Sequence, residues 1–254
     1  MIDTHAHLND PKFDLDREEV RLRARQAGVE RVIHCGYSLE SSQLALRMAR
    51  EWGDAAALGI HPHDALALDE DVLRWIREAA ADPAVVAVGE VGLDFHYDRP
   101  EPHAQKEALR RQFVLAQELA LPLVLHVRES HAALVQELQD HGRGPGGVFH
   151  CFTGTLAEAE EALALGFYLG AGGVVAFPKS GELRATFASV PLERILLETD
   201  SPYLAPPPYR GKRCEPAYVA RVLEVLAEVR GMPREALEQA TTENALRCFP
   251  KLLR

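Results

Sequence analysis

The chain has 254 residues, 47% hydrophobic and 26% charged, which is the composition of a globular protein and excludes disordered and fibrous classes. Its 28 basic and 38 acidic residues give a formal net charge of −10, which argues against a broad basic surface that coats duplex nucleic acid. A nucleic acid held by metal ions and a few local cations stays possible. The sequence has no apolar run of about 18 residues and no secretory-signal pattern at its start, so we expect a cytoplasmic protein with no membrane partner.

Short β-type segments alternate with amphipathic helical segments along the whole chain. Strands are predicted at residues 1–4, 31–34, 55–59, 85–89, 123–126, 147–150, 167–170 and 194–198. Between them apolar residues recur at helical spacing, as Leu109, Phe113 and Ala116 do. Such helical segments are predicted at 16–27, 39–51, 69–81, 102–120 and 130–141. Strands that alternate with helices indicate a parallel sheet with right-handed crossovers.

Eight strands in about 250 residues predict a single α/β domain over residues 1–254, a closed (β/α)8 TIM-type barrel. An open dinucleotide-binding sheet is disfavoured, because no G-x-G-x-x-G motif follows the first strand. The segment 201–216 has too many prolines for a helix or a central strand. Because it follows the eighth strand, we expect it to form a loop over the C-terminal rim of the barrel, where the active sites of such barrels lie.

Histidines gather at this predicted rim. Seven of the 11 lie at or just past the C-terminal ends of predicted strands: His5, His7, His34, His61, His63, His126 and His150. His5 and His7 are two residues apart on one strand, so their imidazoles point to the same side. One His-x-His pair is weak evidence by itself, and the weight comes from ligand-type residues at the ends of several strands.

Two carboxylates complete the set. Glu90 follows an apolar run, where a carboxylate is costly to bury unless it is paired or bound to metal. Asp200 follows the eighth strand; Glu198 would point to the same side, so spacing leaves open which of the two binds metal, and the position nearer the rim favours Asp200.

The His-x-His pair, His126 and His150 supply four imidazoles, and Glu90 and Asp200 supply two carboxylates. These are too many ligands for one tetrahedral catalytic metal. They suit two divalent ions, about 3.5–4 Å apart, that share a carboxylate. Imidazole-rich ligation favours Zn²⁺, Mn²⁺, Fe or Co over Mg²⁺ without fixing the ion. Two such ions beside two carboxylates would leave a positive cavity, which suits an anionic substrate such as a phosphodiester.

Six motifs resemble those of the TatD family, in order and over almost the whole chain. They are Asp3-Thr4-His5-Ala6-His7-Leu8, Gly59-Ile60-His61-Pro62-His63, Gly89-Glu90-Val91-Gly92-Leu93-Asp94, His126, Phe149-His150-Cys151-Phe152-Thr153-Gly154 and Glu198-Thr199-Asp200-Ser201-Pro202-Tyr203-Leu204. The family consists of metal-dependent deoxyribonucleases of the amidohydrolase-like barrel superfamily. The resemblance implies a hydrolase of DNA phosphodiester bonds, a 3′→5′ exonuclease acting on single strands or 3′ ends. It further implies a monomer associated with DNA repair.

The resemblance also implies roles for individual residues. The ligands of one metal would be His5, His7, Glu90 and Asp200. Those of the second would be Glu90, His126 and His150. Asp200 and Glu90 would be the catalytic residues, with Asp200 as the general base for a metal-activated water. The residues that contact substrate or its phosphates would be His61, His63, Lys212 and Arg213.

Several alternatives stay open on the sequence alone. The basic run Arg210-Gly211-Lys212-Arg213 could be a solvated surface patch. Tyr203 and Tyr209 could stack on a base or pack the proline-rich loop. Cys35 and Cys151 are expected to be small core residues, whereas a metal or redox role for Cys214 is open. The same barrel could hydrolyse an ester, lactone or aminoacyl linkage, or be an inactive metal-binding scaffold.

Overall fold

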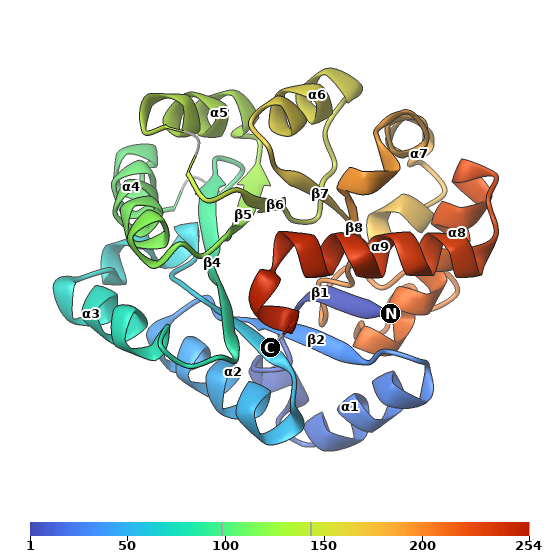
Figure 1. The fold of residues 1–254 in the computed structure, drawn as a ribbon, viewed down its shortest axis with the longest axis horizontal. Helices are drawn as coiled ribbons and strands as arrows, with labels where there is room; N and C mark the ends of the chain where they lie inside the picture. The colour runs from blue at the N-terminus through green and yellow to red at the C-terminus, as the bar shows by residue number, and fades with distance from the viewer. Residues whose placement is uncertain (98, 143, 254) are drawn as a thin grey trace.

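The computed structural model describes residues 1–97, 99–142 and 144–253. Its eight strands run parallel and in chain order around one barrel, with helices outside them, as the sequence predicts (Figure 1). The strands are β1 (Ile2–Ala6), β2 (Arg31–Cys35), β3 (Ala55–Leu58), β4 (Val85–Asp94), β5 (Leu123–Arg128), β6 (Gly147–Phe149), β7 (Tyr168–Ala171) and β8 (Ile195–Leu197). The α-helices are α1 (Arg17–Gln26), α2 (Leu39–Trp52), α3 (Glu70–Ala79), α4 (Pro102–Leu119), α5 (His131–Asp140), α6 (Leu156–Ala164), α7 (Gly181–Ser189), α8 (Val219–Arg230) and α9 (Arg234–Cys248).

Local signals account for where several helices begin. The Asp69 side chain accepts the Val72 N–H at 2.8 Å and so caps α3. Thr155 and Glu158 form a reciprocal capping box at the start of α6. Each cap satisfies backbone donors that have no partner within the helix. None of the helices in the described part of the chain is both long and apolar enough to cross a membrane.

The barrel closes where β1 meets the end of β8. Ala6 pairs with Ser201 in parallel orientation. The His7 N–H donates to the Ser201 carbonyl at 2.6 Å, and the Asp200 N–H donates to the His5 carbonyl at 2.9 Å. The closure therefore brings His5 and His7, near the start of the chain, beside Asp200, which lies almost 200 positions later.

Strand β4 is longer than the predicted 85–89. It continues to Asp94, with all ten residues buried, because its second half pairs with β5, for example Leu93 with Val127. Glycine usually weakens a strand, and Gly89 is the last residue of the predicted one. Here glycine allows close approach: a Cβ on Gly92, whose φ is 148°, would overlap the His126 carbonyl oxygen. The extension carries Glu90 and Asp94 to the rim.

Side chains from the C-terminal end of the chain help to fill the barrel interior near the N-terminal ends of the strands. Apolar side chains such as Val86 and Val124 form one buried cluster with Phe249 and Leu252, which follow α9. In Figure 1, α9 and the end of the chain lie across the face of the barrel turned to the viewer. This face is the one where the strands begin, so the opposite rim is left open for a site.

A buried ion pair joins α1 to the strand layer. The Arg21 guanidinium makes two hydrogen bonds of 2.6 Å to the Asp54 carboxylate, and His34 Nε2 lies 3.1 Å from the same carboxylate. His34, one of the seven strand-end histidines, is fully buried in this structural cluster. Its role is therefore separate from the site on the open rim.

Candidate metal centre

A cavity of about 600 Å³ opens at the C-terminal rim of the barrel. The side chains that line it come from the ends of β1, β4 and β5 and from the loops after β3, β6 and β8. Seven of the predicted site residues line it: His7, His61, His63, Glu90, His126, His150 and Asp200. His5 lies beneath them, fully buried.

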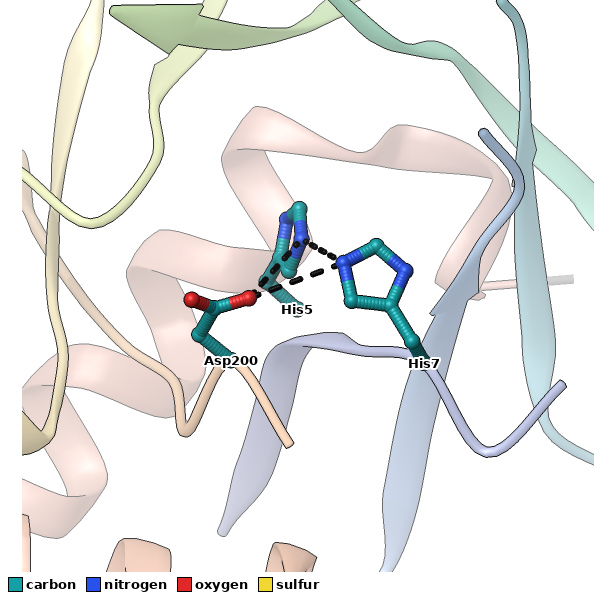
Figure 2. Close-up of side chains that lie close together, drawn as sticks. All are labelled: His5, His7 and Asp200. Atoms are coloured by element: carbon teal, nitrogen blue, oxygen red, sulfur yellow. Dashed lines mark hydrogen bonds and ion pairs between the residues drawn. The ribbon is translucent and has the colours of Figure 1, made fainter. Parts of the chain in front are cut away.

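One candidate ligand group combines His5, His7 and Asp200 (Figure 2). The Nε2 atoms of the two imidazoles are 3.0 Å apart. Asp200 Oδ1 lies 3.7 Å from His5 Nε2 and 3.5 Å from His7 Nε2. His7 Nδ1 is held 2.8 Å from the Cys35 carbonyl, to which it donates its proton, so Nε2 is the atom left for a metal. The three side chains thus aim ligand atoms at one point.

Glu90 connects this group to a second one. Its Oε2 lies 3.4 Å from His5 Nε2 and 3.2 Å from His7 Nε2. Its Oε1 lies 2.8 Å from His126 Nδ1 and 2.8 Å from His150 Nε2. One carboxylate therefore presents one oxygen to each pair of imidazoles, which is the arrangement of a bridging ligand.

His61 and His63 differ in their surroundings. His61 Nε2 is 3.5 Å from Glu90 Oε1, and His61, Glu90 and His126 form a further group with metal-ligand spacing. His63 Nε2 instead lies 2.8 Å from Asp94 Oδ2 and lines the cavity closer to solvent. His61 can thus act as a metal ligand as well as a substrate contact, whereas His63 is placed to contact only a substrate in the cavity.

The electrostatics fit a cationic occupant. Burial opposes charge on His7, but hydrogen bonds to Asp200 and Glu90 outweigh it and raise the His7 pKa to about 10. Burial likewise opposes charge on His126, and Asp94 and Glu90 raise its pKa to about 9. Burial lowers the pKa of His5 to about 3. In the absence of metal, two imidazolium ions therefore balance the carboxylates, and divalent cations would replace them.

Comparison with known proteins gives the family. The model of the TatD-related DNase family matches residues 2–250. The chain belongs to the TatD family. It is 42% identical to the "uncharacterized metal-dependent hydrolase YabD" of Bacillus subtilis, over 98% of both chains. It is also 42% identical to the "3'-5' ssDNA/RNA exonuclease TatD" of Cronobacter sakazakii, over 99% of this chain and 98% of that one. The crystal structure of the TatD homologue YjjV from Escherichia coli superimposes with a TM-score of 0.92, at 36% identity and 98% coverage of each chain.

The choice between the two carboxylates after β8 follows from their partners. Glu198 is fully buried; its Oε1 accepts the Cys151 N–H and lies 3.8 Å from His150 Nδ1. Burial raises its pKa well above the usual range, which disfavours the charged carboxylate that a metal ligand provides. Asp200, with its pKa lowered against burial by His7, belongs to a ligand group. Of the two carboxylates, Asp200 is the one that lies in a candidate ligand group.

The basic run lies away from the cavity. Arg213 is held by Asp16 at 2.6 Å and by Glu215 at 3.3 Å, and its guanidinium also covers the Phe13 ring. Lys212 is exposed, and neither it nor Arg213 is among the described residues that line the cavity. Because its charge is already neutralised by carboxylates, Arg213 has little left to offer a phosphate in this conformation.

The structure also places the aromatic and cysteine side chains whose roles the sequence leaves open. Tyr203 lines the cavity, whereas Tyr209 stacks on Tyr218 with ring centroids 3.8 Å apart and so packs the loop. Cys214 is fully buried outside the candidate ligand groups, and burial raises its pKa to about 12. Cys151 was expected in the core, and this was wrong: it follows β6 and lines the cavity, because the strand ends at Phe149.

Sequence reasoning missed three residues of the site: Asp94, Arg128 and Tyr97, which all line the cavity. Asp94 holds both His63 and His126 through its Oδ2, at 2.8 and 3.3 Å. Two of them carried a signal that could have been used. Asp94 has the parity of Glu90 on β4, and Arg128 has the parity of His126 on β5, so each pair points to one side.

Proposed function

We infer that this protein is a metal-dependent deoxyribonuclease that hydrolyses phosphodiester bonds, and we propose that it works as a 3′→5′ exonuclease on single-stranded ends. The observation that carries the inference is the Glu90 carboxylate, whose two oxygens face two separate pairs of imidazoles at the base of an open cavity. Membership of the TatD family supports the reaction, and the name of the Cronobacter relative supports the direction and the strand preference.

The donor set fits two divalent ions, one held by His5, His7, Glu90 and Asp200 and the other by Glu90, His126 and His150. Such ions lower the pKa of a bound water and polarise a phosphodiester. Asp200 lines the cavity with Oδ1 turned to the imidazoles, which leaves Oδ2 to accept a proton from the attacking water. The buried Cys35 carbonyl keeps His7 in the tautomer that binds metal.

The alternative hydrolases of ester, lactone or aminoacyl linkages are disfavoured by the family. An inactive scaffold is disfavoured because each predicted ligand position holds a ligand-type side chain in the described structure. We further propose that the protein acts as a monomer in the cytoplasm.

The test uses metal-stripped protein, a 5′-labelled single-stranded oligonucleotide, and Mn²⁺, Mg²⁺, Co²⁺ or Zn²⁺ added back. Shortening from the 3′ end gives a ladder with the 5′ label and only a mononucleotide with a 3′ label. Glu90→Gln should abolish cleavage and the binding of both ions, measured by elemental analysis, since it removes the shared carboxylate. Glu160→Gln, on the exposed face of α6, is the matched control and should change neither.

Two results would contradict the proposal. Binding of two ions without cleavage of DNA under any of the four metals would mean that the site has another substrate. A ladder that appears only with the 3′ label would reverse the direction of degradation.

A further inference from the structure

The carboxylates around the cavity take up most of the positive charge that two divalent ions would bring. Among the described residues, four carboxylates line it: Asp64, Glu90, Asp94 and Asp200. Arg128 is the one lysine or arginine among the described residues that line it. Two divalent ions would offset the carboxylates they bind, but a nucleic-acid strand brings a further negative charge with every nucleotide. The protein's own contribution to binding that charge inside the cavity falls to Arg128.

Arg128 stands beyond the metal centre rather than in it. It ends β5 two residues after His126, so both side chains leave the strand on the same side, separated by a rise of about 6.6 Å along it. The strand end is fixed, because the Phe95 N–H donates to the Arg128 carbonyl at 2.9 Å. Residue 128 is thus offset from His126 toward the rim along β5.

The Arg128 side chain is presented to the cavity by an aromatic ring. Its Cζ lies 4.9 Å from the centroid of the Tyr97 ring, and Tyr97 is 55% exposed. No salt bridge engages Arg128 within the described residues, in contrast to Arg213, which two carboxylates hold. A guanidinium ordered by a ring but free of carboxylates keeps its hydrogen-bond donors for an anion.

We propose that Arg128 binds the phosphate adjacent to the scissile one, and that Tyr97 offers its exposed face to the neighbouring base. This rests on the proposed nuclease function. The metal centre takes the scissile phosphate, and the step along β5 separates Arg128 from it. A guanidinium binds two phosphate oxygens at once, and aromatic rings stack on bases of any sequence. Arg128 thereby takes the role that the sequence suggested for Lys212 and Arg213.

The experiment compares two substrates of the metal-loaded enzyme. Bis(p-nitrophenyl) phosphate has one phosphodiester and no adjacent phosphate, whereas a single-stranded oligonucleotide has both. The variants are Arg128→Gln and Arg128→Lys. Arg74→Gln on the exposed face of α3 is the control for loss of one positive charge. Thermal melting of each variant verifies the fold.

For Arg128→Gln, the KM for the oligonucleotide should rise about ten- to hundredfold, while kcat/KM for the small diester stays within about twofold. The slope of log(kcat/KM) against log[salt] for the oligonucleotide should become shallower by about 0.7, the value for one lost phosphate contact on a single strand. The KM of Arg128→Lys for the oligonucleotide should lie between those of the unmodified enzyme and Arg128→Gln. Lysine keeps the positive charge, but its ammonium group cannot bind two phosphate oxygens in the planar geometry of a guanidinium. Tyr97→Leu should raise the KM for the oligonucleotide alone.

Each other outcome overturns the assignment. Equal losses on both substrates would place Arg128 on the scissile phosphate. An unchanged KM and salt slope for Arg128→Gln would mean that Arg128 binds no phosphate. If the unmodified enzyme cleaves the oligonucleotide in that case, the proposed nuclease function still holds. Failure of the unmodified enzyme to cleave the oligonucleotide would overturn the proposed function and this inference with it.

Discussion

Metal binding is expected to release protons, about one for each ion. In the metal-free protein His7 has a pKa of about 10 and His126 one of about 9, so both are protonated at neutral pH. His5 is already neutral, since burial lowers its pKa to about 3. A metal ligand must be neutral imidazole, so each site gives up one proton as its ion binds.

The cost of this deprotonation follows from the same pKa values. At about pH 7.5, removing the proton costs about 3 kcal/mol for His7 and about 2 kcal/mol for His126, at 1.36 kcal/mol per pKa unit. Because both pKa values are raised, the cost falls as pH increases. The apparent affinity of each site should therefore rise about tenfold per pH unit from about pH 6.5 and level off above the pKa of its histidine.

Calorimetric titration of the metal-stripped protein with Mn²⁺ measures the proton count. The observed heat is compared among buffers with different enthalpies of ionisation, and the slope gives the protons released. Asp94→Asn is an internal control: Asp94 helps to raise the pKa of His126, so the variant should release fewer protons at the second site and the same number at the first. Heats that are independent of the buffer would refute the reasoning, because they would mean that both histidines are neutral before metal arrives.

Three further predictions concern the scaffold. Phe249→Ala removes a fully buried ring beneath the barrel and should lower the free energy of unfolding by about 3–5 kcal/mol in urea titrations. A loss below about 1 kcal/mol would mean that neighbouring side chains move into the cavity left by the ring. Asp54→Asn leaves the buried Arg21 guanidinium without its charged partner and should cost about 3–5 kcal/mol by the same measurement, so an unchanged urea midpoint would argue against a desolvated pair. Gly92→Ala should lower both the melting temperature and the activity, because its Cβ would overlap the backbone of β5. Gly181→Ala should lower neither, because its Cβ meets nothing within 4 Å. Equal effects of the two variants would contradict the close approach of β4 and β5 at Gly92.

Much of the fold was predictable because its signals are local. Eight predicted strands correspond to the eight observed, and the proline-rich segment after the last is a loop until Pro216 begins a short 3-10 helix. The main error was the length of β4. Gly89 and Gly92 look like strand breakers in sequence, and only the neighbouring backbone of β5 reveals that Gly92 permits close packing there.

For the site, the sequence by itself determined which residue types stand at the ends of which strands, because strand periodicity and the parallel barrel send such residues to one rim. It could not determine distances between residues far apart in the chain. Only closure of the barrel brings Asp200 beside His5 and sets Glu90 between two pairs of imidazoles.

The partners of charged side chains were likewise decided by the tertiary structure. Arg213 has the same charge as Arg128, and its place in a basic run made it the more conspicuous of the two. The carboxylates of Asp16, just before α1, and of Glu215 neutralise Arg213, whereas Arg128 faces the cavity over an aromatic ring. The electrostatic role of a side chain depends on what lies within a few ångströms of it, and folding alone sets those neighbours.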